Sequence, residues 1–285
     1  MSKEEADQVF TGLGRRRPRL TDAQTAEAML ETALRELTRT GLTVGLDHIR
    51  LEDIIREAGV ARSAVYRRWP HKDQFLGDLL LELARSATPR HSPSLTAAID
   101  LIRATLLDRL DELRDPARRL QIAVEVLRDT AETDFQHVYR SSQWRTYLAL
   151  TVTFISLPPG PLHDKVAEAL ATTEAGFTAG ITAGYRLISD LLGLRLRHES
   201  VDFEVIAQLV NGMMRGLVVK ALAAPELAER HIVGDLFGVD GEWSLPALGL
   251  SGIVTSFLEP DGEWDDAQLL SLRKLLETGN PYFKD

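Results

Sequence analysis

Apolar residues recur along most of this chain with the spacing of an α-helix. Over residues 22–40 they fall three and four positions apart, which predicts an amphipathic helix, and Gly41 follows as its C-terminal stop. The same periodicity predicts further helices over 51–58, 61–69, 71–86, 95–113, 117–130, 133–156, 162–193, 202–224 and 265–277. No alternating strand pattern of useful length occurs, so we expect an all-α fold.

Residues that break helices divide this pattern into domains. Gly59 predicts a sharp turn, and Pro70 and the segment PPGP at 158–161 separate neighbouring helices. The segment TPRHSPS at 88–94 predicts a hinge. We therefore expect an N-terminal arm over 1–19, a three-helix domain with the start of a fourth helix over 20–86, and a larger helical domain over 87–285. The run 225–258 is interrupted by glycines and stays unassigned, apart from a helix near its end.

Composition excludes several classes of protein. The 285 residues include no cysteine, which rules out disulfides and thiolate chemistry and fits a reducing compartment. No apolar run approaches the ~20 residues that span a bilayer, and the first ten residues lack the apolar core of a secretion signal. We expect a cytoplasmic protein with no membrane partner.

Charge is distributed unevenly along the chain. The whole carries a net charge of −9, but residues 12–86 carry +2 and residues 87–285 carry −9. The stretch VARSAVYRRWPHK at 60–72 holds four basic residues and no carboxylate. A local basic surface of this kind can meet phosphate, although charge alone fits a solvated face equally well.

Two short helices joined by a glycine turn, 51–58 and 61–69, form a predicted helix-turn-helix, whose second helix can enter the major groove of DNA. At 100° per residue, one arc of the second helix is polar: Arg62, Ser63, Tyr66 and Arg67. Ala61, Ala64 and Val65 fall on the opposite side, where we expect packing against neighbouring helices. The polar face and the packing face are therefore separated.

The polar arc offers side chains for two kinds of DNA contact. Arg62 can pair with the edge of a guanine, and Ser63 can read or support a base. Tyr66, Arg67 and Lys72 suit phosphate oxygens, which fix register without reading sequence. For Trp69, anchoring the helix inside the domain is the alternative to stacking on a base, and we expect the anchor.

Two other groups of basic residues remain. We expect Arg68, on the packing side, to pair with an acidic neighbour. The arginines Arg15, Arg16 and Arg17 of the segment RRRPR could enter the adjacent minor groove or remain in a solvated tail.

The segments MLETALRELTRTGL (29–42) and LEDIIREAGVARSAVYRRWPHKDQFL (51–76) resemble the N-terminal domain of the TetR family of bacterial regulators. The resemblance covers about 60 of 285 residues, and several spacings agree at once. The landmarks that match the family pattern are Ala33, Gly41, Asp53, Ile54, Ala58, Gly59, Val60, Tyr66, Lys72 and Leu76.

Departures from the family pattern bear on the operator sequence. Ala61 stands where the pattern often has a capping serine or threonine, and Arg50 stands where it usually has threonine or serine. Ser63 and Ala64 replace glycine and threonine, and Trp69 replaces phenylalanine. Arg50 and Ala61 therefore join the candidate DNA-contacting residues, with a charged phosphate contact expected at Arg50.

The resemblance implies a repressor of transcription that binds a palindromic double-stranded operator as a homodimer and is released by a small molecule. It implies no cofactor and no enzymatic activity. A helical regulator controlled by a protein partner is one alternative. An enzyme is another, but the seven histidines show no close metal spacing, and neither a Walker-type loop nor a GxSxG motif is present.

The resemblance also places a dimer interface on a late helix. The segment 202–224 carries an apolar surface that is broad for a lone surface helix, and Val210, Met214, Leu217 and Val218 are our candidates for the interface. An intramolecular core would bury part of the same surface.

Two features of the body could bind a largely apolar effector. Gly176, Gly180 and Gly184 form a stripe where a neighbouring helix or a ligand can approach closely. Aromatic and methionine side chains could line an apolar cavity, or they could be ordinary core residues. The candidate ligand-binding residues are Trp144, Tyr147, Phe177, Tyr185 and Met213.

Overall fold

The computed structural model describes residues 20–40, 49–86 and 93–278. The chain divides into two compact units, residues 1–82 and 83–285. The expected arm 1–19 with Arg15, Arg16 and Arg17, the stop at Gly41, and residues 88–92 of the expected hinge lie outside the described residues.

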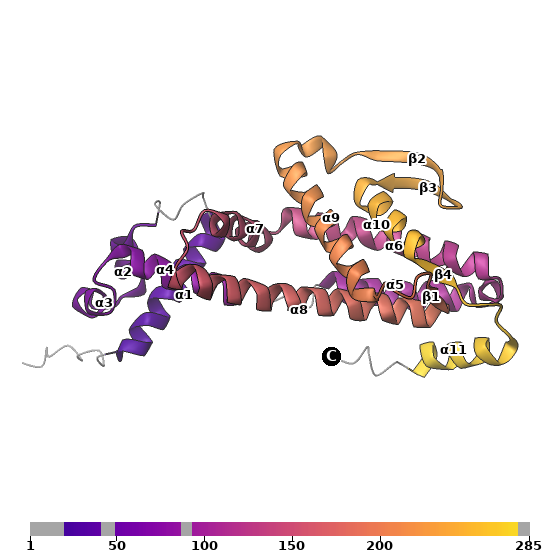
Figure 1. Ribbon diagram of the computed structural model, residues 1–285, viewed down its shortest axis with the longest axis horizontal. Helices are drawn as coiled ribbons and strands as arrows, with labels where there is room; N and C mark the ends of the chain where they lie inside the picture. The colour runs from indigo at the N-terminus through magenta and orange to yellow at the C-terminus, as the bar shows by residue number, and fades with distance from the viewer. Residues whose placement is uncertain (1–19, 41–48, 87–92, 279–285) are drawn as a thin grey trace, which may run out of the picture. The chain divides into compact units, whose positions relative to one another are not determined.

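The smaller unit contains α1 (Asp22–Thr40), α2 (Leu51–Ala58), α3 (Arg62–Arg68) and the first part of α4 (Lys72–Ser86) (Figure 1). All four helices agree with the predicted ranges to within one residue at each end. Thr21 and Gln24 form a reciprocal capping box, in which each side chain accepts a hydrogen bond from the backbone N–H of the other, at 3.0 and 3.2 Å. Gly59 ends α2 with φ 65°, in the left-handed region that favours glycine.

A small apolar core fixes α3 against the other helices of this unit. Val65 is fully buried, and the Trp69 side chain that follows α3 is only 2% exposed. The Trp69 indole donates a hydrogen bond to Oδ2 of Asp78 at 2.9 Å, and its ring meets the edge of Phe75 at 5.1 Å between centroids. Met29 of α1 is fully buried in the same unit. Trp69 is therefore an anchor, as expected.

The larger unit is also helical, which confirms the predicted all-α class. It contains a few short strands, which pair in two two-stranded antiparallel sheets that the sequence did not predict. Its elements are α5 (Pro93–Asp108), a 3₁₀ helix (Leu110–Arg114), α6 (Pro116–Arg140), α7 (Ser142–Ile155), α8 (Pro161–Leu192), β1 (Leu194–Leu196), α9 (Phe203–Ala223), a 3₁₀ helix (Pro225–Leu227), β2 (His231–Leu236), β3 (Val239–Ser244), α10 (Leu245–Phe257), β4 (Leu258–Pro260) and α11 (Asp266–Thr278).

The predicted break between helices near residue 131 is wrong. Helix α6 continues to Arg140 because its buried face continues through Ala131 and Phe135, and no glycine or proline interrupts it. The break comes at Ser141, whose side-chain oxygen accepts from the backbone N–H of Trp144 at 3.3 Å and so caps α7.

A β-hairpin occupies the glycine-rich segment that the sequence left unassigned. Strands β2 and β3 pair from His231↔Ser244 to Leu236↔Val239, which leaves Phe237 and Gly238 as a two-residue turn. Both turn residues have positive φ, 55° and 76°, as a type I′ turn requires. Phenylalanine is an unusual residue in this conformation, and no sequence signal marks it.

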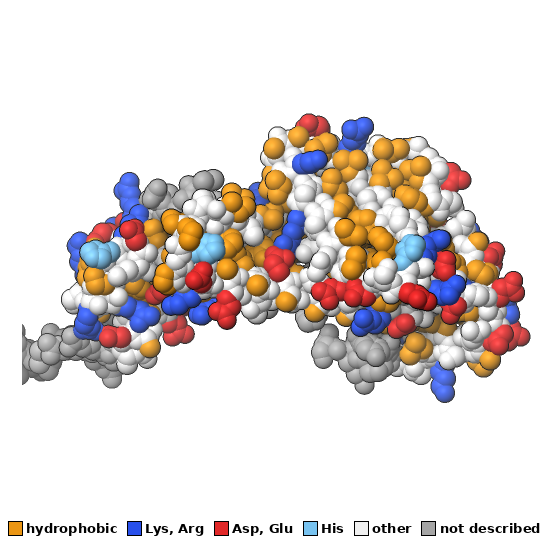
Figure 2. All heavy atoms as spheres, in the orientation of Figure 1, with side chains coloured by type: hydrophobic (Ala, Val, Ile, Leu, Met, Phe, Trp, Pro, Cys, Tyr) orange, Lys and Arg blue, Asp and Glu red, His pale blue; other side chains and the backbone are white. Residues whose placement is uncertain are grey.

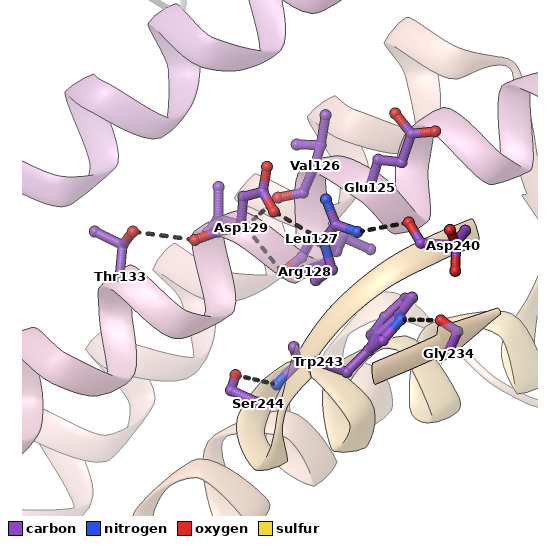
Figure 3. A network of polar contacts seen from close by, with 12 residues as sticks. Glu125, Val126, Leu127, Arg128, Asp129, Thr133, Gly234, Asp240, Trp243 and Ser244 are labelled. Atoms are coloured by element: carbon purple, nitrogen blue, oxygen red, sulfur yellow. Dashed lines mark hydrogen bonds and ion pairs between the residues drawn. The ribbon is translucent and has the colours of Figure 1, made fainter. Parts of the chain in front are cut away.

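An arginine of α6 holds this hairpin in place. The guanidinium of Arg128 lies 5.5 Å from the ring centroid of the fully buried Trp243, and it donates to the backbone oxygen of Asp240 at 3.4 Å (Figure 3). The Trp243 indole donates across the hairpin to the oxygen of Gly234 at 3.3 Å. The strands thus become part of the core of the larger unit.

Helix α9 packs against α8, α6 and α10 at the centre of the larger unit. By length and composition alone, this helix of 21 residues is also long and apolar enough to cross a membrane. The expectation that no segment comes near this length therefore has to be corrected. It carries Arg215 and Lys220 in its second half, it packs against three helices of the larger unit, and 28% of its apolar window is buried there.

Replacement of Trp69 by alanine tests the anchor of α3. Truncating a large buried aromatic side chain costs about 3–5 kcal/mol, and here the hydrogen bond to Asp78 is lost as well. We expect the free energy of unfolding of the smaller unit to fall by this amount in urea denaturation followed by circular dichroism. The exposed neighbour His71 provides the control, because His71→Ala should change stability by less than about 0.5 kcal/mol. Equal effects of the two changes would contradict the assignment.

Candidate functional site

The exposed face of α3 carries the polar residues that the helical periodicity placed there. Arg62, Ser63, Tyr66 and Arg67 are exposed, whereas Val65 on the opposite side is fully buried. The Arg62 side chain is 68% exposed. The prediction that the polar side and the packing side of this helix are separate is therefore confirmed for these residues.

The two alanines of this helix behave differently from each other. Ala64 is partly buried, as expected of a packing residue. Ala61 is exposed, which corrects the expectation that it packs inward, because it precedes the helix as the N-cap and points away from the core. It provides no side-chain cap.

A carboxylate of α2 organises the polar face of α3. Oε1 of Glu52 accepts hydrogen bonds from Nη2 of Arg62 at 2.7 Å and from the hydroxyl of Tyr66 at 2.6 Å. The Arg62 guanidinium also lies 5.8 Å from the centroid of the Tyr66 ring. Glu52 thus holds two side chains of α3 in one defined arrangement.

The other arginines of this stretch also have acidic partners. Arg67 forms an ion pair with Asp22 in the first turn of α1. Arg68 lies 3.9 Å from Oδ2 of Asp78, which agrees with the acidic neighbour expected for it. The stretch 60–72 has no carboxylate of its own, but α1, α2 and α4 bring carboxylates to its three arginines, so the positive charge expected there is partly compensated in the folded unit.

These ion pairs are weak enough to be exchanged. The side chains of Arg62, Glu52, Arg67 and Asp22 are each about half exposed or more. Exposed pairs contribute a median of about 0–1 kcal/mol, because water and salt screen them. A polyanion that approaches this face can therefore replace the carboxylates as partners of the two arginines.

Two further basic candidates lie at the beginnings of helices. Arg50 is exposed and precedes α2 as its N-cap, with no hydrogen bond from its side chain to the helix. Lys72 is the first residue of α4 and is partly exposed. Because the N-terminal end of a helix favours anions, both positions combine a cationic side chain with a favourable backbone dipole.

Three of the five candidate ligand-binding residues meet in the larger unit. Trp144 and Tyr147 of α7 lie 5.0 and 5.6 Å from Phe177 of α8, between ring centroids. The guanidinium of Arg215 of α9 lies 5.2 Å from the Phe177 ring and donates from Nη1 to Oε1 of Glu174 at 2.6 Å. The Tyr147 hydroxyl donates to the same oxygen. We call these five residues the Arg215 cluster.

The other two candidates lie apart from this cluster. Tyr185 belongs to the main core of the larger unit, and Met213 packs against that core beside Gly249 of α10. Sequence reasoning did not pick out Arg215. The available signal was that Arg215 is the only charged residue between Glu204 and Lys220 in a largely apolar helix, since a buried charge of this kind requires a partner.

The candidate dimer-interface residues differ in how deeply they are buried in their own chain. Val210 and Val218 are buried in the core of their own chain, and Met214 and Leu217 are partly buried. Apolar side chains gather over α9 and α10 on the surface in Figure 2. The large apolar residues of α9 that are exposed are Val205, Leu209, Val219 and Leu222.

The glycines of α8 and α9 face open space. No atom of the described residues, apart from adjacent backbone, lies within 4 Å of the position that a Cβ would take at Gly176, Gly180 or Gly184. The same is true of Gly212 and Gly216 on α9. No helix among the described residues therefore fills the glycine stripe, and close approach of a neighbouring helix was one of its two expected uses.

Two tyrosines of the larger unit have pKa values that are raised by burial. Burial, reinforced by the hydrogen bond to Glu174, raises the pKa of Tyr147 above its ordinary value. Burial, with the charge of Asp134 as a smaller cause, raises the pKa of Tyr185. Within the described residues, no group of three or more histidine, aspartate or glutamate side chains could hold a metal ion.

Comparison with known proteins identifies the smaller unit. Residues 30–79 match the family model described as "Bacterial regulatory proteins, tetR family". The match runs from the middle of α1 through α2 and α3 into α4, and so includes the whole helix-turn-helix. No curated protein matches the chain.

Solved structures that resemble this chain include a repressor and a protein described as a regulator of transcription. SmeT, the repressor of the Stenotrophomonas maltophilia multidrug efflux pump SmeDEF, is 18% identical over 84% of this chain and 93% of its own, with a TM-score of 0.39. The structure described as the SmeT–triclosan complex is 17% identical over 85% of this chain and 94% of its own, with a TM-score of 0.39. A protein described as a TetR-family transcriptional regulator from Mesorhizobium loti is 14% identical over 84% of this chain and 99% of its own, with a TM-score of 0.44.

The raised tyrosine pKa values can be measured by absorbance at alkaline pH. We expect the native protein to ionise fewer of its 5 tyrosines near pH ~10 than the urea-unfolded chain, because Tyr147 and Tyr185 remain protonated while folded. Because the pKa of each tyrosine is higher in the folded state, its protonated form stabilises the fold at pH values below the unfolded pKa of about 10. The fold loses this contribution as the pH rises further. Tyr147→Phe should remove one late-ionising group, and an unchanged titration would contradict the assignment.

Proposed function

We propose that this TetR-family DNA-binding transcriptional regulator is a repressor that binds a palindromic operator as a homodimer and is released from it by a small molecule. One observation carries the proposal. The segment that matches the family, residues 30–79, is the segment whose α3 presents a polar face outward and a buried valine inward. Specificity of transcription control requires such a face, because base edges are read in the major groove.

The proposed base contacts come from the exposed side of α3. Arg62 exchanges its hydrogen bond to Glu52 for a bidentate pair with a guanine, and Ser63 beside it supports a neighbouring base. Tyr66 exchanges the same carboxylate for a phosphate oxygen. Glu52 then acts as a placeholder that keeps both side chains in position before DNA arrives.

The proposed phosphate contacts surround the base contacts. Arg67 exchanges Asp22 for phosphate, and Arg50 and Lys72 bind phosphate at the beginnings of α2 and α4. Ala61, exposed and without a long side chain, leaves room for the DNA backbone next to the first turn of α3. The arm arginines are proposed to enter the adjacent minor groove.

The open faces of α8 and α9 support a homodimer. The two helices pack against each other and both leave glycine stripes uncovered, so that a second copy could approach closely enough for backbones to make contact. Burial of the exposed Val205, Leu209, Val219 and Leu222 would supply the apolar driving force. A dimer of this kind presents two α3 helices to half-sites about one DNA turn apart, ~34–36 Å.

The Arg215 cluster supports the ligand-responsive part of the proposal. It joins α7, α8 and α9 through three aromatic rings and one ion pair, so a molecule bound there would change the packing of three helices at once. The proposed effector contacts these rings with an apolar body. The protein is proposed to act in the cytoplasm, where its operator lies.

Binding to operator DNA selected from a random pool tests the proposed roles of Arg62 and Lys72. We expect Arg62→Ala to lose about 1–3 kcal/mol of preference between the selected site and its base-pair variants, because a base contact is removed. Lys72→Ala should weaken binding to all sites alike and lower the magnitude of the salt slope by about 2 for a dimer, because one phosphate contact is lost in each subunit. Arg39, an exposed arginine of α1 paired with Glu36, provides the matched control.

The salt dependence of the wild-type protein gives an independent check on the same contacts. With about four cationic contacts to phosphate per subunit, log K should fall with log salt at a slope of magnitude about 5–8 for a dimer. A flat salt response, or equal loss across sites for Arg62→Ala and Lys72→Ala in gel-shift titrations, would contradict this division of roles.

A single charge on α9 tests the dimer. Leu209 is 45% exposed on the open face, and we expect Leu209→Glu to produce monomers at micromolar concentration, because two like charges would meet across a symmetric apolar interface. Sedimentation velocity measures the mass. The control is Leu270→Glu on α11, an equally apolar residue that is even more exposed. The proposed interface is wrong if Leu209→Glu leaves the mass of the wild-type species unchanged.

A further inference from the structure

Arg215 is a charged residue in a setting that disfavours charge. It lies in the middle of the apolar helix α9, and its side chain is only 18% exposed. Removing a guanidinium from water costs several kcal/mol unless hydrogen bonds and an opposite charge replace the lost hydration. The hydrogen-bond partners of its three nitrogens therefore decide whether the lost hydration is replaced.

The protein satisfies only part of the guanidinium. Nη1 donates to Oε1 of Glu174 at 2.6 Å. Nε and Nη2 are buried, and no group among the described residues accepts a hydrogen bond from either atom. Buried charged donors that lack an acceptor are rare, because each costs more than a hydrogen bond contributes.

The two unpaired atoms form one geometric unit. Nε and Nη2 lie on the same edge of the planar guanidinium, and their N–H bonds point outward in parallel. This edge matches the two oxygens of a carboxylate, which it binds with two parallel charge-assisted hydrogen bonds. The missing partner is thus defined by its shape as well as its charge.

Three aromatic rings lie close to the Arg215 guanidinium and provide flat apolar surfaces beside it. The centroids of Trp144, Tyr147 and Phe177 lie 5.7, 5.4 and 5.2 Å from the central carbon of the Arg215 guanidinium. Cation–π attraction at these distances holds the guanidinium in place. The rings can also contact the apolar part of a ligand whose acidic group binds Arg215.

Glu174 gives the cluster its outlet to solvent. Its side chain is 36% exposed, so the ion pair lies at the open side of the cluster. Glu174 also holds the Tyr147 hydroxyl, whose raised pKa keeps it a protonated donor. An incoming anion has to compete with this carboxylate for Arg215.

Other classes of ligand fit the cluster less well. A cationic ligand would compete with Arg215 for the same ring faces and would be repelled by the like charge of its guanidinium. A purely apolar ligand would leave Nε and Nη2 without acceptors. An anion with two coplanar oxygens removes the deficit.

We propose that Arg215 binds the carboxylate of a small, flat, apolar acid, with Nε and Nη2 as the donors and the rings of Trp144, Tyr147 and Phe177 as the walls. This inference rests on the proposed ligand-responsive function and specifies the chemical class of its effector.

Calorimetric titration of the full-length protein without DNA tests the class directly. Three probes share one ring system and differ in charge: 2-naphthoate, 2-naphthamide and 2-naphthylmethylammonium. We expect the carboxylate to bind about 10- to 100-fold more tightly than the amide, because two hydrogen bonds to a charged group are gained, and the ammonium to bind most weakly. Equal affinity for carboxylate and amide, or no detectable binding of the carboxylate, would overturn the proposal.

Variants then assign the preference to one side chain. Arg215→Gln should reduce the ratio of carboxylate to amide affinity to about one, whereas Arg215→Lys, which keeps the charge but loses the flat edge, should retain only part of it. The matched control is Arg186→Gln on α8, an exposed arginine that also lies over an aromatic ring, Phe203, at 5.7 Å. An unchanged ratio in Arg215→Gln overturns the proposal.

A second variant keeps the test decisive if Arg215→Gln does not fold. Glu174→Gln removes the competing carboxylate and should raise the affinity for 2-naphthoate, whereas an arginine whose role is only to pair with Glu174 predicts no gain. Circular dichroism checks that each variant is folded. A fall in 2-naphthoate affinity in folded Glu174→Gln would count against the proposal.

A gel shift with and without 2-naphthoate distinguishes binding of the acid by Arg215 from ligand-controlled release of DNA. If the acid binds through Arg215 and leaves the DNA complex intact, the inference stands and ligand-controlled release fails. If the wild-type protein binds DNA and the acid shows no dependence on Arg215, the inference fails and the DNA-binding function stands.

Discussion

The orientation of one short helix depends on the burial of Val65 and Trp69. Helix α3 has only seven residues, too few to be stable alone in water, so tertiary packing has to hold it. Val65 is fully buried, and Trp69 is tied to Asp78 by a hydrogen bond and to Phe75 by ring contact. With this side fixed, the rotation of the helix is determined, and its arginines, serine and tyrosine face outward.

The charges on that outward face are arranged by their neighbours. Glu52 and Asp22 neutralise Arg62 and Arg67 before DNA is present, which fits a chain whose net charge is −9 and which has to avoid indiscriminate polyanion binding. Because these pairs are exposed and weak, their replacement by phosphate costs little. Pairing of this kind limits the flexibility of long side chains, so less conformational entropy is lost when DNA is bound.

Sequence reasoning succeeded where the physics is local. The period of apolar residues located α1 to α4 within one residue, and Gly59 marked the turn because its backbone there has a positive φ that favours glycine. It failed where partners are distant along the chain. Glu52 lies ten residues from Arg62 and Asp22 lies 45 from Arg67, so no window of sequence shows either pair. A type I′ turn built on phenylalanine carries no compositional signal.

The body shows the same division between local and distant information. Trp144, Tyr147 and Phe177 could be selected as candidates because aromatic residues are conspicuous, but their meeting at Arg215 depends on the packing of α7, α8 and α9.

Hydroxyl-radical footprinting of the whole protein by mass spectrometry, with and without operator DNA, tests the central claim most directly. The account predicts that DNA protects Tyr66 while Trp69 stays unlabelled in both states. Labelling of Tyr66 that does not change when DNA binds would contradict it.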